Sequence, residues 1–259
     1  HLFAQYLRQR LDRDQPGRIE QLHRTASVWS ADHAMLGEAV DHALAAGDPG
    51  RAVELVERDG GGLVQQGRMF TLLGLVAKLP PQQVSQSARL QLTIAWANNA
   101  AVRPGAAQAA VDGARALLTA HQGDDLKLAD LRVEADVIQA DIHVISDRID
   151  GVEELVAECL SRPDTLPAWV VSCAADDAVF ANLFRFDFDA ARRRHQWALT
   201  YHARTRGPLS AVYGYRFAGL AASEQLDMAA AEDLFREGLR MATTAGDQHS
   251  YPARVASAL

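Results

Sequence analysis

The chain has 259 residues, of which 48% are hydrophobic and 23% are charged, and its formal net charge is −7. This acidic balance argues against a surface that grips a phosphate backbone by itself. No apolar run approaches the roughly 20 residues that a membrane-spanning helix needs. The two cysteines, Cys159 and Cys173, lie outside any paired metal or redox spacing, which favours free thiols in a cytoplasmic setting.

Helical periodicity dominates the first third of the chain. Apolar residues recur three and four positions apart, and Pro, Gly and Asp mark the breaks between segments. The pattern predicts helices over residues 2–13, 18–31, 36–46, 51–57 and 69–79. We expect the glycine run 60–62 to form a break, most simply a flexible link before the repeats that follow.

From Ser87 onward the pattern becomes regular, and four helix pairs are expected. Their second helices span residues 105–118, 147–160, 186–199 and 226–239. The closing leucines, at 118, 160, 199 and 239, are therefore 42, 39 and 40 residues apart. A nearly fixed interval of this size is typical of a solenoid of stacked helix pairs, because one pair cannot bury its apolar face alone.

Two further features recur in the second helices. Small or slender residues lie eight positions before the closing leucines, at Ala110, Val152, Ala191 and Ala231. They favour close packing between neighbouring helices. Aspartates at Asp150, Asp189 and Asp227 are expected to cap three of these helices by accepting from free N–H groups of the first turn.

The repeat character is similar to that of tetratricopeptide repeats, although the intervals exceed the usual ~34 residues of that family. The segment HLFAQYLRQRL at 1–11 resembles the last helix of the winged-helix module in large LuxR-type, MalT-like transcriptional activators. Further matching segments are LHRTA at 22–26, EAVDHALAAGD at 38–48, TLL at 71–73 and AKLP at 77–80. The likeness is good over about 2–118, and beyond that it is one of repeat character.

In that family an NTPase module precedes this region, a DNA-binding helix-turn-helix follows it, and the superhelix between them binds an inducer or an inhibitory protein. This chain has no GxxxxGK[ST] phosphate loop and no visible helix-turn-helix segment. It begins at His1 without an initiator methionine, and residues 248–259 look like the first helix of an uncompleted pair. The resemblance therefore implies an effector-sensing fragment of a transcriptional regulator, without its NTPase and DNA-binding modules.

The fold class expected is all-α: a superhelix, or α-solenoid, of tetratricopeptide-like helix pairs preceded by a short helical remnant of a winged-helix module. By the resemblance, residues 1–32 form the end of that module and a connecting helix. Residues 33–86 form a helical linker or first repeat, and residues 87–259 form the superhelical sensor domain.

No catalytic or metal centre is expected. The histidines form no HxxxH pair or Cys/His cluster, and no GxSxG sequence is present. The basic run 192–194 is interpreted as a solvated outer face, because acidic residues such as Asp187, Asp189 and Glu232 surround it. We therefore expect no cofactor, no direct nucleic-acid binding and no membrane contact.

Candidate ligand-binding residues lie on the first helices, which line the concave groove in tetratricopeptide-like arrays. Counting backward from each closing leucine, with a constant turn between helices, gives the inward-facing positions. They are Asn99, Arg103, Glu134, Asp141, Asp176, Phe180, Phe184, Tyr213, Arg216 and Glu224. This set can bind a polar small molecule such as a sugar, because it combines carboxylates, an amide, guanidinium groups and aromatic rings.

Alternatives to this interpretation remain open. Phe180 and Phe184 are four residues apart on an apolar helix, a spacing that packing alone explains. The tryptophans at 96, 169 and 197 are equally consistent with core positions of their repeats. The alternative function is a protein-interaction scaffold whose groove holds a regulatory protein or peptide, and the sequence does not decide whether the chain forms a homo-oligomer.

Overall fold

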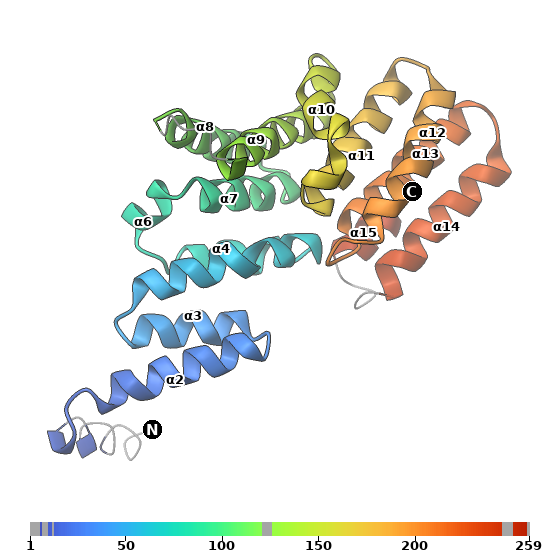
Figure 1. Ribbon diagram of the computed structural model, residues 1–259. Coiled ribbons are helices and arrows are strands. Elements are labelled where there is room, and N and C mark those ends of the chain that lie inside the picture. The colour runs from blue at the N-terminus through green and yellow to red at the C-terminus, as the bar shows by residue number, and fades with distance from the viewer. Residues whose placement is uncertain (1–5, 7–9, 12, 121–125, 245–250, 258–259) are drawn as a thin grey trace.

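The computed structural model describes residues 6, 10–11, 13–120, 126–244 and 251–257, and these form an all-α fold without a strand (Figure 1). Most of the helix expected over 2–13, and with it much of the winged-helix resemblance, lies outside the described residues. Among the described helices, none combines the length and apolar character that crossing a bilayer requires. The domain boundaries expected at 32/33 and 86/87 stay predictions.

The first part of the chain forms a run of neighbouring helices. They are α2 (Arg18–Asp32), α3 (Leu36–Ala45), α4 (Pro49–Gln65), α5 (Met69–Val76) and α6 (Pro81–Gln86). Helix α2 packs against α3, and α3 packs against α4. Three of the expected helices match α2, α3 and α5 to within a few residues, whereas α4 is much longer than expected.

Four helix pairs follow, as the periodicity predicts. They are α7 (Ala88–Ala100) with α8 (Pro104–Ala120), α9 (Leu126–Ile145) with α10 (Val152–Ser161), α11 (Ala168–Phe184) with α12 (Phe188–His202), and α13 (Leu209–Glu224) with α14 (Met228–Thr244). A short 3-10 turn, η1 (Pro163–Thr165), precedes α11, and α15 (Tyr251–Ser257) ends the described chain. The first helices α7, α9, α11 and α13 also pack against one another in chain order.

The expected break at the glycine run is wrong, because residues 60–62 lie inside α4. Close packing explains the glycine at position 60. A Cβ there would come within 2.9 Å of Leu72 Cδ1 on α5 and 3.5 Å of Thr93 Cγ2 on α7. Each glycine weakens a helix by about 1 kcal/mol relative to alanine, and the burial of α4 against its neighbours offsets that cost.

The turn inside each of the four pairs has the same backbone form. Val102, Asp147, Phe186 and Leu226 adopt left-handed φ values between 54° and 61°. In the first pair, the N–H of Val102 donates to the carbonyl of Asn99 at 2.8 Å, and that of Arg103 donates to Asn98 at 2.9 Å. This pair of hydrogen bonds is the Schellman motif, which provides donors for carbonyl groups at the end of the helix.

The turn also decides where the next helix is capped. In the last two pairs the residue after the left-handed one is the N-cap: Asp187 accepts from Ala190 N at 3.0 Å, and Asp227 accepts from Ala230 N at 3.1 Å. The expected cap at Asp227 is therefore confirmed. The caps expected at Asp189 and Asp150 are wrong, because α12 begins two residues earlier and α10 begins after Gly151 without a side-chain cap.

Replacing Val102 with glycine should raise the free energy of unfolding by about 1 kcal/mol. A β-branched residue is strained in the left-handed region, whereas glycine is not, and Val102 is exposed, so little packing is lost. Urea denaturation measures the effect. The matched control is Val28→Gly in the right-handed backbone of α2, which should destabilise the chain. A loss of stability with Val102→Gly contradicts the prediction.

Helix α11 is the centre of the fold. It packs against α9, α10, α12 and α13, and every residue from 170 to 181 is buried. A helix buried on all sides is normally apolar all round. Helix α11 nevertheless carries Asp176 and Asp177, which are only 4% and 1% exposed. Two buried carboxyls at the most enclosed point of the chain require an explanation.

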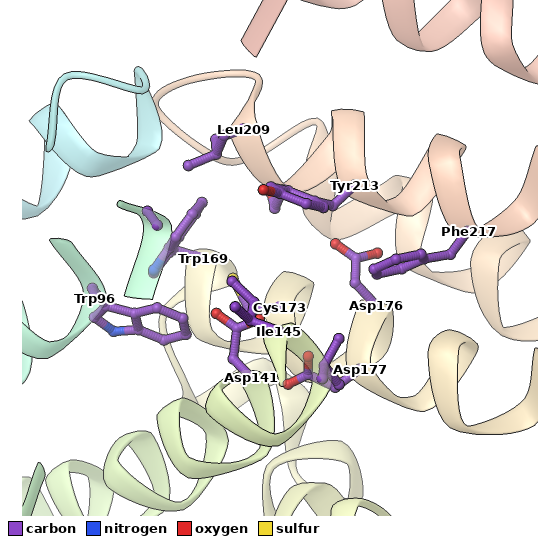
Figure 2. Close-up of a pocket in the computed structure, with 13 residues that line it drawn as sticks. Trp96, Asp141, Ile145, Trp169, Cys173, Asp176, Asp177, Leu209, Tyr213 and Phe217 are labelled. Atoms are coloured by element: carbon purple, nitrogen blue, oxygen red, sulfur yellow. The ribbon is translucent and has the colours of Figure 1, made fainter. Parts of the chain in front are cut away.

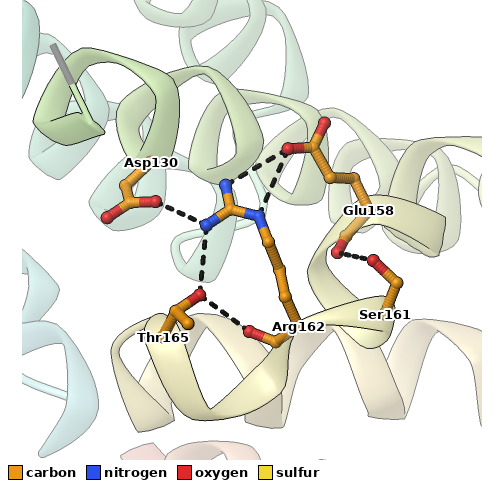
Figure 3. Close-up of polar contacts among 5 residues, drawn as sticks. All are labelled: Asp130, Glu158, Ser161, Arg162 and Thr165. Atoms are coloured by element: carbon orange, nitrogen blue, oxygen red, sulfur yellow. Dashed lines mark hydrogen bonds and ion pairs between the residues drawn. The ribbon is translucent and has the colours of Figure 1, made fainter.

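The start of α11 is held by a polar cluster around Arg162 (Figure 3). Its guanidinium donates to Asp130 of α9 at 2.8 Å, to Glu158 of α10 at 3.2 Å and to the hydroxyl of Thr165 in η1 at 3.1 Å. One side chain thus joins the second pair to the turn that leads into α11. The pair α9–α10 and the entry to α11 are thereby held together.

The later helices return to the end of α4. The backbone N–H of Arg206, in the segment between α12 and α13, donates to Gln65 Oε1 at 2.7 Å. Helix α13 contacts α4, and Pro252 of α15 lies against Gly67 just after α4. Figure 1 shows α13 and α15 beside the C-terminal end of α4. This contact anchors the start of α13 to a helix far earlier in the chain.

Gly207→Ala tests that anchor. An added Cβ would overlap the backbone carbonyl of Gln65, which cannot move aside as a flexible side chain can. We expect a loss of about 1–3 kcal/mol in unfolding free energy and faster hydrogen exchange at the end of α4. Gly61→Ala, where nothing lies within 4 Å, is the control and should be neutral or stabilising. Equal effects of the two substitutions would contradict the anchor.

Candidate functional site

The first helices of the four pairs enclose a cavity (Figure 2). It contains about 500 Å³ of empty space, including the part open to solvent. Its lining comes from α7 (Trp96, Ala100), α9 (Asp141, Val144, Ile145), α11 (Trp169, Cys173, Asp176, Asp177) and α13 (Leu209, Ser210, Tyr213, Phe217). Residues from one face of each helix therefore meet in one place, as the 3.6-residue period requires.

Aromatic rings form much of the cavity wall. Trp96 and Trp169 meet edge to face with ring centroids 5.4 Å apart. At the other end, Phe217 meets Phe180 edge to face at 5.2 Å, so Phe180 supports the wall from behind. Tyr213 lies between these ends on α13 and its hydroxyl is 3.3 Å from that of Tyr251 on α15. The rings offer flat, apolar faces to a bound molecule.

Two of the three lining carboxyls share a proton. Asn99 donates to Asp141 Oδ2 at 2.7 Å, and Asp141 is also hydrogen-bonded to Asp177. Burial raises the pKa of Asp141 to about 6 and raises the pKa of Asp177 well above its usual range. A carboxyl donates only when it is protonated, so Asp177 holds the proton and Asp141 accepts it.

The third carboxyl, Asp176, faces a buried imidazole. Its Oδ1 is 3.3 Å from His202 Nε2, and His202 Nδ1 is 2.5 Å from the Ser172 hydroxyl, which donates to Ser210 at 2.8 Å. Burial raises the pKa of Asp176, and the neighbouring His202 opposes that rise. Ser172 is wholly buried and does not line the cavity. We therefore interpret this series of polar contacts as a structural link between α11, α12 and α13.

Glycine makes room for the Asp176–His202 contact. A Cβ on Gly214 of α13 would lie 2.6 Å from Asp176 Oδ1 and 2.7 Å from His202 Nε2. Even so, neither oxygen of Asp176 has a hydrogen bond of good geometry within the described part of the chain. The same part of the chain contains no group of three His, Cys, Asp or Glu side chains that could hold a metal ion.

Five of the residues selected from the sequence belong to this cavity or its immediate support. Asp141, Asp176 and Tyr213 line it, Asn99 holds Asp141, and Phe180 supports Phe217. Counting backward from the closing leucines therefore identified the cavity-facing side of the first helices correctly for residues near the middle of each helix. Whether these residues bind a ligand stays a prediction.

Other selected residues lie elsewhere. Glu134 accepts from Arg89 at 2.5 Å and from the indole N–H of Trp96 at 3.0 Å, and it lines a neighbouring charged groove. Arg216 is half-buried but does not line the cavity. Phe184, Glu224 and Arg103 are exposed, and the Arg103 guanidinium lies over Phe70. These three lie at or beyond the ends of their helices, where the constant-turn assumption no longer selects the buried face.

The sequence interpretation missed Asp177, Cys173 and Phe217 as lining residues, and it treated the two tryptophans as candidate core. A signal for most of them was present. Trp169, Cys173 and Asp176 are spaced i, i+4 and i+7, which places them on one face of a helix. Asp177 required the structure, because an adjacent residue points about 100° away around a single helix.

Asp141→Asn should change how stability depends on pH. The folded chain holds the pKa of Asp141 at about 6, above the value near 4 expected when unfolded. Its contribution to stability is therefore complete below about pH 4 and is lost as pH rises through about 6. Relative to wild type, the variant should gain on the order of 3 kcal/mol between pH 4 and pH 7.

Urea denaturation of both proteins at several pH values measures this difference. The polar groups near Asp141 that remain in the variant are Asn99, Cys173, Asp176, Asp177 and Tyr213. Asp112→Asn, at an exposed position of α8, is the matched control. A difference between Asp141→Asn and wild type that does not change with pH would contradict the prediction.

Comparisons with known proteins give two kinds of likeness. No family model matches the chain, and no solved structure matches it. The chain is 44% identical over 258 residues to the serine/threonine-protein kinase PknK of Mycobacterium tuberculosis (strain H37Rv), and equally to PknK of Mycobacterium bovis. The match covers 100% of this chain but only 23% of the length of these relatives.

The second likeness is weaker and is to a regulator of transcription. The HTH-type transcriptional regulator MalT of Yersinia enterocolitica is 26% identical over 160 residues, which cover 61% of this chain and 17% of the regulator. The expected likeness to MalT-like regulators is thus supported in part. The fuller match to part of a protein kinase was not expected from the sequence.

Proposed function

We propose that the chain is the ligand-sensing domain of a larger regulatory protein and binds a small molecule in the cavity between α7, α9, α11 and α13. The oxygens of Asp176 carry this proposal: they lie in a solvent-connected aromatic cavity and have no hydrogen bond of good geometry within the described residues, although Oδ1 faces His202. An unpaired polar group is costly to bury, by about 1–3 kcal/mol or more. A ligand that hydrogen-bonds these oxygens would recover that cost.

The proposed architecture is a tetratricopeptide-like superhelix with the first helices on its concave side. Two observations support it. The first helices pack in chain order, and the turns within the pairs share one left-handed conformation. The shared left-handed turn gives the pairs a similar internal geometry, although the connection between α9 and α10 is longer and contains a second left-handed residue, Gly151. Similar geometry within the pairs is the condition for a regular superhelical stack.

Sensing follows from where the cavity lies. A molecule inside it touches helices from four successive pairs, and α13 is also anchored to the end of α4. A ligand that prefers the arrangement in which these helices are drawn together shifts the population toward it, in proportion to its differential affinity. Modules elsewhere in the protein, such as the kinase or helix-turn-helix named in the relatives, would read that shift.

A thermal-shift screen of the chain tests the proposal. The panel contains neutral sugars, sugar phosphates, amino acids and organic amines. A compound at a hundred times its dissociation constant should add about 2.7 kcal/mol of stability if it binds only the folded state. Asp176→Asn should weaken the response, and Asp112→Asn, at an exposed position of α8, should keep it.

The alternative scaffold function makes a different prediction. No compound would then stabilise the chain, whereas a peptide or protein that binds it would protect the first helices from hydrogen exchange. A saturable response that is unchanged in Asp176→Asn would place binding outside this cavity and overturn the assignment of the site.

A further inference from the structure

We infer that the cavity selects an organic cation, namely an ammonium group with N–H donors attached to an apolar body. This inference rests on the proposed function and specifies the chemical class of its ligand. It is argued from three properties of the lining: its charge, its rings and its supply of hydrogen-bond donors.

The charge of the lining favours a cation. Three carboxyls line the cavity, of which Asp177 holds the proton that it donates to Asp141, and no lysine or arginine lines it. Both oxygens of Asp176 lack a hydrogen bond of good geometry within the described residues, although this side chain is more than nine-tenths buried. The imidazole Nε2 of His202 lies 3.3 Å from Asp176 Oδ1 and leaves Oδ2 without a neighbouring donor among the described residues. A phosphate or carboxylate ligand would meet repulsion here, whereas an ammonium would complete the site.

The rings favour the same ligand. Trp96, Trp169, Tyr213 and Phe217 surround the carboxyls, and Figure 2 shows Asp176 between Tyr213 and Phe217. An ammonium is attracted to the face of an aromatic ring as well as to a carboxylate. The remaining wall, which includes Val144, Ile145 and Leu209, is apolar and suits a hydrocarbon body rather than a second polar group.

The supply of donors disfavours a neutral polyol. A sugar hydroxyl both donates and accepts, so its site needs donors as well as acceptors. The indole N–H of Trp96 is already committed to Glu134. Ser210 accepts from the Ser172 hydroxyl and the Tyr213 hydroxyl lies 3.3 Å from that of Tyr251, so these two neutral hydroxyls are the main donors left in the lining. The acceptors beside them include the oxygens of Asp176, which have no hydrogen bond of good geometry within the described residues. A primary ammonium, with three donors and no acceptor, has the complementary pattern.

A series of probes that share one apolar body tests the inference on the unmodified chain. The probes are 2-phenylethylammonium, 2-phenylethanol and 3-phenylpropionate, with hexylammonium as a second cation and glucose and maltose as neutral polyols. Binding is measured by calorimetry at pH 7.5. We expect 2-phenylethylammonium to bind at least ten-fold more tightly than 2-phenylethanol, and 3-phenylpropionate to bind more weakly than either.

Two variants locate the effect. Asp176→Asn keeps the shape of the side chain and should remove most of the ten-fold preference for the cation while retaining weak binding of the neutral probe. Asp112→Asn, equally conservative and exposed on α8, should retain the preference. The head-group comparison on the wild-type chain stands even if Asp176→Asn does not fold.

The outcomes separate the two proposals. Equal binding of the ammonium and the alcohol, or Asp176-dependent binding of a polyol without binding of the cations, overturns the inference and leaves the sensing cavity in place. A preference for the cation that survives in Asp176→Asn also overturns it. The absence of binding by every probe and every compound of the wider screen overturns both proposals.

Discussion

The burial of two adjacent carboxyls in α11 is the constraint on which the rest of this structure depends. Four neighbouring helices enclose α11, so Asp176 and Asp177 point in different directions and still do not reach bulk solvent. Each of the two carboxyls has its own set of polar partners. Asp177 is neutralised by a proton that it shares with Asp141, which Asn99 also holds, and Asp176 faces His202 in space left by Gly214. These partners come from α7, α9, α12 and α13. The polar contacts that offset the cost of burying the two carboxyls therefore also link the helices that surround the cavity.

The helix pairs supply the scaffold that brings those partners together. Each pair turns through the same Schellman motif, with a left-handed residue that is not glycine in any of the four pairs. Repeating one strained turn gives the first helices a common orientation, and the anchor between Arg206 and Gln65 holds the last of them near the first part of the chain. A cavity built from four pairs is sensitive to small changes in how the pairs stack, which is what the proposed sensing function requires.

The proposed regulatory role rests on two independent kinds of observation, the comparisons and the cavity. The chain aligns along its whole length with part of PknK, and over a shorter stretch with part of MalT, so similar sequence regions occur in a protein named as a kinase and in one named as a transcriptional regulator. The cavity contains an aromatic wall and incompletely paired carboxyls but no group of residues arranged to hold a metal within the described chain. The proposed recognition of a small molecule would use those features directly, since incompletely paired acceptors define what the bound group must supply.

The sequence by itself determined the all-α class, the four helix pairs and the inward face of the middle of each first helix, because these follow from local periodicity and from a repeat interval of about 40 residues. It placed Asp141, Asp176 and Tyr213 on the correct face for the same reason. Only the tertiary structure decided that α4 continues through its glycines, that Glu134 is engaged by Arg89 and Trp96, and that Asp177 meets Asp141. Each of those outcomes depends on a partner from a different helix, and periodicity along one helix carries no information about the side chains that another helix brings against it.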